Sequence, residues 1–254
     1  MNSVPKFSII SLFPDLITHA SSFGVLGRAI TNNSIQIEIF NPRDYTDDPR
    51  STVDDSSYGG GPGMVMQVTP IRRAILAAKK SPIKVDEVIY LSPQGTRVGQ
   101  KEIVEIGQNS HTVFLAGRYE GIDQRLIDSD ITREVSLGDF VMSGGEFAAL
   151  AILDAVSRSL PGVLGNQLSA SEDSFHAGLL DHPHYTRPEE VDGQSVPPVL
   201  LSGDHEAIRR WRRKMSLGAT YTKRPDLLTL SLLSSEDEML LSEFRAEMQN
   251  KEAF

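Results

Sequence analysis

Three apolar segments in the middle of the chain each run into a glycine-bounded loop, and this repeated order restricts the fold more than any other feature. The pairs of segment and loop are Val88–Leu91 with Ser92–Gly95, Thr112–Ala116 with Gly117–Gly121, and Ile131–Leu137 with Gly138–Gly145. A stretch of helical pattern follows each loop, over residues 99–106, 124–128 and 146–160. Strands that alternate with helices predict a three-layer α/β sandwich around a mostly parallel sheet.

The N-terminal part of the chain fits the same fold. Residues 7–13 form an apolar run that predicts a buried strand, and Pro14 suits the first turn of a helix. Apolar and polar residues alternate over 35–39 with the period of a strand, and residues 71–80 have a helical pattern. Residues 41–63 are polar and interrupted, which predicts a long loop.

Periodicity is lost over residues 161–192, and we place the domain boundary there. Beyond this region the pattern is helical. Residues 205–216 predict one helix, and Ser235–Glu238 has the spacing of a capping box that opens the last helix. The expected organisation is an α/β domain over 1–164, a linker over 165–180 and a small helical C-terminal domain over 181–254.

The amino-acid composition excludes several classes of protein. None of the 254 residues is cysteine, which excludes a disulfide scaffold, a thiolate nucleophile and an iron–sulfur cluster. Lys and Arg number 25 against 34 Asp and Glu, so the net charge of −9 argues against a non-specific nucleic-acid binder but leaves room for a local basic patch. The sequence shows no signal peptide and no apolar run long enough to span a membrane. We therefore expect a cytoplasmic protein.

The three glycine-bounded loops together predict one pocket for a small molecule. In open parallel sheets, ligands bind beyond the carboxyl ends of the strands, where glycine lets the backbone approach them closely. None of the loops matches a dinucleotide or P-loop fingerprint, although Glu120 is suited to hold ribose hydroxyls. For any single loop an ordinary turn is the better interpretation. Three such loops at successive strand ends favour a pocket.

Two features of the long polar loop have a functional and a plain interpretation. Gly59–Gly63 resembles a phosphate cradle, but no Lys follows at P-loop spacing, which favours a flexible turn. Asp54 and Asp55 are candidates for acid–base work or for cation binding, and a solvated pair of carboxylates is the alternative.

Carboxylates and imidazoles crowd the segment after the boundary, at Asp173, His176, Asp181, His182 and His184. They fit a metal site, a polar linker with incidental His, or a linker that folds over a ligand and delivers one carboxylate as a general base. The spacing matches no established zinc pattern, so we expect no metal site.

The dense basic run of the chain lies on the predicted helix 205–216, at Arg209, Arg210, Arg212, Arg213 and Lys214. Ile208, Trp211 and Met215 share the apolar face of that helix, so we expect the cations to point outward together. The run is either a solvated helix face or a contact for the phosphates of a nucleic acid.

Several segments, in order along the chain, resemble the bacterial tRNA (guanine-N1)-methyltransferases of the knotted SPOUT class. They are YGGGPGM, LSPQG, GRYEG, GDFVMSGGE, SRSLPGVLG, EDSF, GLLDHPHYTRP and HEAIRRW, followed by a spaced Lys and SLG. The resemblance extends from about Phe7 to Leu228. It implies a trefoil knot in the C-terminal part of the α/β domain and a homodimer whose active sites are shared across the interface.

The resemblance also implies that S-adenosylmethionine binds in the knot loops. The residues that match the family's cofactor contacts are Leu91, Pro93, Gly117, Glu120, Gly121, Leu137, Gly138, Asp139, Phe140, Val141, Met142, Gly144 and Gly145. The implied reaction methylates N1 of guanosine 37 in tRNA, beside the anticodon and preceded by a guanosine, which supports reading-frame maintenance. The resemblance also implies that the reaction uses Mg²⁺, although the sequence contains no magnesium-binding motif.

The chemistry of this reaction gives the matched residues their roles. Guanine N1 must lose a proton before it attacks a methyl group, and Asp173 of EDSF matches the family's base. Negative charge then spreads to O6, where Arg158 of SRSLPG matches the stabilising cation. The expected substrate-binding residues are Asp54, Arg118, Asp181, Arg209 and Arg213, the last two on tRNA phosphates. The linker that bears Asp173 is expected to close as a lid.

Two other functions stay open at this point. A non-catalytic nucleotide-binding regulator would keep the pocket, but the presence of both Asp173 and Arg158 speaks against it. A metal-dependent hydrolase would use the His- and Asp-rich segment instead. Metal analysis of the purified protein would distinguish a hydrolase from a methyltransferase.

Overall fold

The computed structural model describes residues 4–165, 173–230 and 233–252. These form two compact units, Met1–Gly165 and Asn166–Phe254, which are described separately. The first unit ends one residue beyond the predicted limit of the α/β domain.

The first unit is built on a five-stranded parallel sheet with the order β2-β1-β6-β5-β7. Its strands are β1 (Lys6–Ile10), β2 (Gln36–Phe40), β5 (Glu87–Arg97), β6 (His111–Ala116) and β7 (Arg133–Ser136). This confirms the parallel α/β sheet expected from the repeated strand–loop–helix order. The central strands β1 and β6 are buried on both faces, as parallel strands between helices must be.

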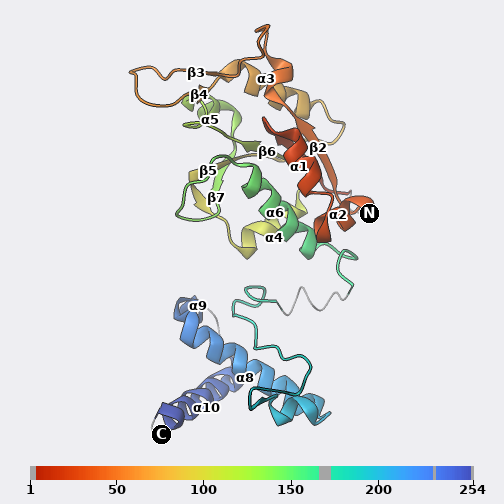
Figure 1. Ribbon diagram of the computed structural model, residues 1–254, viewed down its shortest axis with the longest axis vertical. Coiled ribbons are helices and arrows are strands. Elements are labelled where there is room, and N and C mark those ends of the chain that lie inside the picture. Colours follow the sequence, from red (N-terminus) through yellow and green to blue (C-terminus); the bar gives the residue numbers. More distant parts are fainter. Residues whose placement is uncertain (1–3, 166–172, 231–232, 253–254) are drawn as a thin grey trace. The chain divides into compact units, whose positions relative to one another are not determined.

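Helices cover both faces of this sheet (Figure 1). One apolar cluster holds side chains of α1 (Pro14–Ala20), α2 (Gly24–Thr31), α4 (Gln100–Gln108) and α6 (Glu146–Ser159). The other cluster holds those of α3 (Val68–Lys79) and α5 (Gln124–Asp130). The strands feed the two clusters alternately: Phe114 of β6 lies in the first, and its neighbours Val113 and Leu115 lie in the second.

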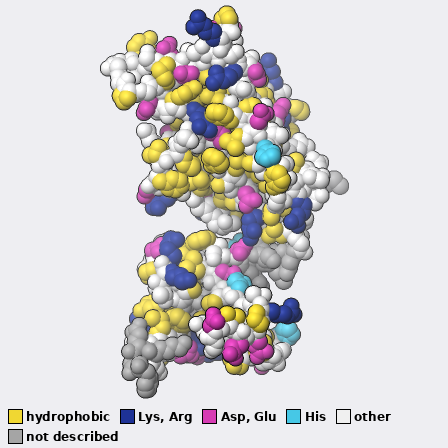
Figure 2. All heavy atoms as spheres, viewed as in Figure 1, with side chains coloured by type: hydrophobic (Ala, Val, Ile, Leu, Met, Phe, Trp, Pro, Cys, Tyr) yellow, Lys and Arg dark blue, Asp and Glu magenta, His cyan; other side chains and the backbone are white. Residues whose placement is uncertain are grey.

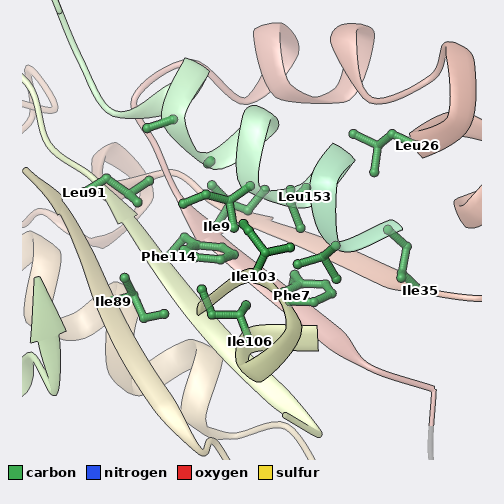
Figure 3. Close-up of a cluster of buried hydrophobic side chains, with 14 of the residues drawn as sticks. Phe7, Ile9, Leu26, Ile35, Ile89, Leu91, Ile103, Ile106, Phe114 and Leu153 are labelled. Atoms are coloured by element: carbon green, nitrogen blue, oxygen red, sulfur yellow. The ribbon is translucent and has the colours of Figure 1, made fainter. Parts of the chain in front are cut away.

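The first cluster is packed around two aromatic rings (Figure 3). Phe7 of β1 and Phe114 of β6 are fully buried, and their stacked ring centroids lie 6.0 Å apart. Ile103 and Ile106 of α4 pack beside them, and Leu153 of α6 closes the cluster above the sheet. Burying side chains of this size stabilises the fold by roughly 1.5–3 kcal/mol each.

The strand β5 differs from the sequence prediction, because we expected it to end at Leu91 and to turn at Ser92–Gly95. It continues to Arg97, and its pairing with β7 jumps from Leu91–Val135 to Thr96–Val135. The intervening residues leave the ladder as a bulge. Gly95 lies so close to the Val135 backbone that a Cβ would collide with it. Proline and glycine mark this bulge, and in the sequence alone they predict a turn.

The long polar loop contains two short elements that the sequence did not predict, and a third follows directly after it. They are the 3₁₀ helix η1 (Pro42–Tyr45) and the antiparallel pair β3 (Asp54–Asp55) and β4 (Val65–Met66). The rest of residues 41–63 is irregular, as expected.

The second unit contains the hairpin β8 (Glu190–Val191) and β9 (Gln194–Ser195), the 3₁₀ helix η2 (Pro198–Leu201), and the helices α8 (His205–Lys223), α9 (Pro225–Leu230) and α10 (Ser235–Glu252). Leu217 of α8, Leu240 of α10 and Leu179 form its core. The helix α8 extends well past the predicted Ser216. No helix among the described residues is both long and apolar enough to cross a membrane.

The capping box of α10 lies one residue earlier than predicted. The Asp237 backbone N–H donates to the Ser234 hydroxyl over 3.1 Å, and the Ser234 N–H donates to the Asp237 carboxylate over 3.1 Å. Ser234 directly precedes the helix and Ser235 is its first residue, and Ser234, three residues before Asp237, serves as the cap.

Candidate active site

The three loops at the carboxyl ends of β5, β6 and β7 surround a cavity of about 430 Å³. Twelve of the thirteen residues predicted to hold a cofactor line it. The exception is Asp139, which is exposed and has Arg97 as an ion-pair partner at 3.9 Å. The glycine-bounded loops predicted a pocket at these strand ends, and the residues matched through the family resemblance lie along its wall.

Two glycines are required where the loops cross the end of the sheet. A Cβ on Gly117 would lie 2.7 Å from the Tyr90 ring, and one on Gly145 would lie 2.8 Å from Cα of Ala116. The Gly145 N–H donates to the Gly117 carbonyl over 3.0 Å, which joins the loop after β6 to the start of α6. Backbone atoms thus form much of the cavity wall.

Tyr90 is a cavity residue that sequence reasoning missed. It lies inside the buried strand β5, and its ring supports Gly117 while its hydroxyl lies against Gly121. Burial, reinforced by the nearby Glu134 carboxylate, raises the pKa of Tyr90, so the phenol is neutral at pH 7. The sequence signal that could have identified Tyr90 is its hydroxyl group, the one polar group in the apolar segment Val88–Leu91.

Arg118 is held by a buried carboxylate beside the cavity. Its Nε donates to Oε2 of Glu146 over 3.0 Å, and Nη1 donates to the Ser143 carbonyl over 3.1 Å. Glu146 is fully inaccessible, and its Oε1 accepts a hydrogen bond from Ser11 over 2.9 Å. The Arg118 guanidinium also lies 4.3 Å from the centre of the Phe13 ring. These contacts tie the loop after β6 to the loop that precedes α6.

The glycine-rich turn of the long loop lies against the same site. Glu120, which lines the cavity, is so close to Gly63 that a Cβ there would collide with its side chain. The Glu120 N–H donates to the Met64 carbonyl over 2.9 Å, and the Met66 N–H donates to the Gly121 carbonyl over 2.9 Å. This turn therefore packs on a cavity loop. Asp54, which pairs with Met66 across the β3–β4 ladder, does not line the cavity.

Arg158 lies at the far end of α6 from the cavity. Gly145 precedes the N-terminus of α6 and lines the cavity, and Ala148 is the last helix residue to do so. Ten residues of helix separate Ala148 from Arg158, roughly 15 Å along the axis. Within one chain, the structure does not bring Arg158 to the cavity.

Asp173 and Asp181 belong to the second unit. The Asp173 carbonyl accepts from the His176 N–H over 3.4 Å in a turn, and Asp181 lies beside His182 and His184. Of the predicted linker 165–180, residues 166–172 lie outside the described residues.

The basic run of α8 does not form the free outward-facing row of cations that we predicted, because most of its side chains are paired and Lys214 is largely buried. Four of its five cations form ion pairs with carboxylates of α10: Arg209 with Glu236, Arg210 with Glu243, Arg213 with Asp237 and Lys214 with Glu247. Glu206 adds a second partner for Arg209. Among the described residues, Arg212 has no ion-pair partner. The sequence prediction failed because α10, which supplies the opposing charges, follows more than twenty residues later.

Comparison with known proteins agrees with the sequence motifs. The chain matches the family model described as tRNA (Guanine-1)-methyltransferase TrmD over residues 5–230. A tRNA (guanine-N(1)-)-methyltransferase of Photorhabdus laumondii is 54% identical over 239 residues, which cover 94% of this chain and 96% of the relative. Proteins of the same name from Vibrio cholerae and Marinomonas sp. are 52% and 53% identical, over 96% of this chain and 98% of each relative.

Proposed function

The chain belongs to the tRNA (guanine-1)-methyltransferase family, and from this premise we propose how its residues carry out the reaction. It is an S-adenosylmethionine-dependent enzyme that methylates N1 of guanosine 37 in tRNA. We propose that the guanosine is preceded by another guanosine, that the modification supports reading-frame maintenance, and that the enzyme works in the cytoplasm, where its tRNA substrate is found.

The cavity at the ends of β5, β6 and β7 fits S-adenosylmethionine. Its volume of about 430 Å³ falls within the roughly 300–1,000 Å³ of small-molecule sites. Gly117 and Gly145 keep this wall free of side chains, because a Cβ at either position would collide with its neighbours, and Glu120 supplies a carboxylate for the hydroxyl groups of a ribose. When bound, the cofactor supplies an electrophilic methyl group on a sulfonium sulfur. The close contact of loops 117–121 and 138–145 supports the proposal that this region is knotted.

Asp173 is the proposed general base. Guanine N1 carries a proton at neutral pH, and a carboxylate within hydrogen-bond reach can accept it as N1 becomes nucleophilic. Arg158 is the proposed partner for O6, where a fixed cation stabilises the negative charge that develops. Asp54, Arg118 and Asp181 are proposed to position the tRNA. Mg²⁺ is proposed as an accessory ion of the methyl transfer, and no residue is assigned to hold it, because Glu120, the one acidic residue lining the cavity, is already the proposed contact for the ribose.

The position of Arg158 supports the proposal that the active site is shared between two chains. Because this side chain lies at the far end of α6 from its own cavity, its proposed role requires the cavity of a second chain. The first unit also exposes large apolar side chains, among them Phe13, Phe23 and Phe147 at 47%, 62% and 53% of their surface. Figure 2 shows hydrophobic side chains gathered over the middle of this unit. Such exposure is typical of an interface, which in a homodimer would be two-fold symmetric.

Mixing two inactive variants tests the shared site. Glu120→Ala impairs the cavity and Asp173→Asn removes the base, so a heterodimer of the two retains one intact site if each site combines two chains. The mixture should recover about a quarter of wild-type activity, because half of the dimers are mixed and each has one working site. No recovery after subunit exchange would show that each chain builds its own site.

The reaction itself is tested with labelled S-adenosylmethionine and tRNA transcripts that differ only at guanosines 36 and 37. Label should enter the transcript that has both guanosines and should be lost when guanosine 37 is replaced. Incorporation that ignores position 37 would overturn the proposed target. Omitting Mg²⁺ with the chelator EDTA present tests the ion separately from the methyl acceptor.

A further inference from the structure

Three side chains of the kinds that ligate metal ions converge within the second unit. The candidate ligand atoms of Asp181, His182 and His184 all lie within 4.8 Å of one another. Nε2 of His184 is 2.8 Å from Oδ2 of Asp181, while Nδ1 of His182 is 3.7 Å from Oδ1. The two imidazole rings are 4.5 Å apart between centroids.

The hydrogen bond between His184 and Asp181 gives a partner to two of the three side chains, and His182 is not part of it. Nδ1 of His182 is buried and has no hydrogen-bond partner among the described atoms. An unsatisfied buried polar atom costs roughly 1–3 kcal/mol, so a native fold that keeps one generally has a use for it. Here the unpaired nitrogen faces the carboxylate that His184 also contacts.

The segment that carries these side chains is anchored to α8. The Leu180 N–H donates to the Thr220 hydroxyl over 2.9 Å, and the Ser216 hydroxyl donates to the Leu180 carbonyl. The Asp181 N–H donates to the Ser174 hydroxyl over 2.9 Å. The Trp211 ring lies 6.3 Å from that of His182. These contacts fix the backbone of the cluster before any ion arrives, which lowers the cost of binding.

We propose that Asp181, His182 and His184 bind a divalent transition-metal ion of the zinc class. Two imidazole nitrogens and one carboxylate oxygen suit Zn²⁺, whereas Mg²⁺ prefers oxygen ligands alone. Ligands about 2.1 Å from a tetrahedral ion lie about 3.4 Å apart, so the widest pair of atoms needs to approach by no more than about 1.4 Å, and Nε2 of His184 and Oδ2 of Asp181 need to separate slightly. His182 and His184 also line a cavity of about 500 Å³, which leaves room for water as the fourth ligand.

The test uses the full-length chain without an affinity tag, dialysed free of metal and kept without tRNA or S-adenosylmethionine. Titration calorimetry with Zn²⁺ should show one saturable site per chain. Bound Co²⁺ should show the visible absorption of an ion with nitrogen and oxygen ligands. The chain has no cysteine, so no thiolate–cobalt absorption can overlap with it. The single Trp lies beside His182, so its emission should change with the same midpoint.

His184→Ala is the decisive variant, because 71% of this side chain is exposed and its removal leaves the packing intact. Zn²⁺ affinity should fall by at least about 10–100-fold, the loss seen even when only a residue behind a metal ligand is removed. His176→Ala, which removes an exposed His outside the cluster, is the matched control and should bind like the wild type. Absence of saturable binding, or equal binding by His184→Ala, would overturn the site. Because no substrate is present, either result leaves the proposed methyl transfer untouched.

Discussion

Arg213 of α8 and Asp237 of α10 form a two-pronged ion pair in which Nε lies 2.6 Å from Oδ1 and Nη2 lies 2.9 Å from Oδ2. The same carboxylate caps α10 through Ser234. Only 8% of the Asp237 side chain is exposed, so the pair is shielded from water as an interhelical contact. Planar pairing of this kind is among the stronger charge-assisted contacts in proteins.

Asp237→Ala should destabilise the second unit by about 2–4 kcal/mol, because it removes a cap and leaves Arg213 without its buried partner. The single Trp lies on α8, so its emission during urea unfolding reports on this unit. Glu238→Ala removes an exposed carboxylate from the same helical turn and should cost less than about 0.5 kcal/mol. Equal losses in the two variants would mean that the ion pair adds nothing beyond surface charge.

The same pair predicts how stability changes in acid. Arg213 is the main cause that lowers the pKa of Asp237 to about 2 from its ordinary value of 3.8. A carboxyl whose pKa is lowered by folding stabilises the protein above its unfolded pKa, and this contribution is lost as pH falls through the folded pKa. About 2 kcal/mol should therefore disappear between roughly pH 4 and pH 2. Asp237→Asn should lack this component when Trp emission is followed, and identical acid profiles would contradict the assignment.

The ion pairs of α8 also bear on tRNA binding. Arg209 is half exposed and shared between Glu206 and Glu236, so phosphates would compete with these carboxylates for it. Arg209→Gln should weaken tRNA binding and reduce the salt slope by about 1, whereas Glu236→Gln should strengthen binding by freeing the cation. S-adenosylmethionine affinity should be unchanged in both variants. If Glu236→Gln also weakens binding, the ion pair itself orders the surface that tRNA contacts.

How far the sequence predicts this structure depends on how local the determining contacts are. The parallel sheet of the first unit follows from the repeated strand–loop–helix pattern, although α2 had no predicted counterpart, and the twelve cavity residues follow from the family resemblance. The extension of β5 to Arg97 does not, because Gly95 is required by the backbone of Val135, forty residues later. The pairing of Arg213 with Asp237 was missed for the same reason. Tyr90 was not predicted because the apolar pattern of a buried strand does not indicate which of its side chains contact a ligand.

Glu146 links stability to the cavity in a way that can be measured. Glu146→Gln should cost about 3 kcal/mol in the free energy of unfolding, because Arg118 loses its buried partner. It should also weaken S-adenosylmethionine binding, since Arg118 holds the carbonyl of Ser143, a cavity residue. Ser11→Ala leaves the Arg118–Glu146 ion pair in place but removes a hydroxyl that donates to Glu146 and accepts from the Phe13 N–H, so it should cost about 2 kcal/mol with cofactor affinity retained. Calorimetry that finds wild-type affinity in Glu146→Gln would show that Arg118 does not support the site.

Asp173→Asn tests the proposed base while keeping the size of the side chain. If Asp173 accepts the N1 proton, the variant should bind S-adenosylmethionine normally and tRNA nearly so, but single-turnover methylation should fall by about 10²–10⁴. Asp181→Asn is the comparison, because it removes the next carboxylate along the chain. Loss of tRNA affinity alone in Asp173→Asn would make Asp173 a positioning residue and direct the search for the base to Asp181 or Asp54. A near-normal single-turnover rate would exclude the EDSF segment from the chemical step.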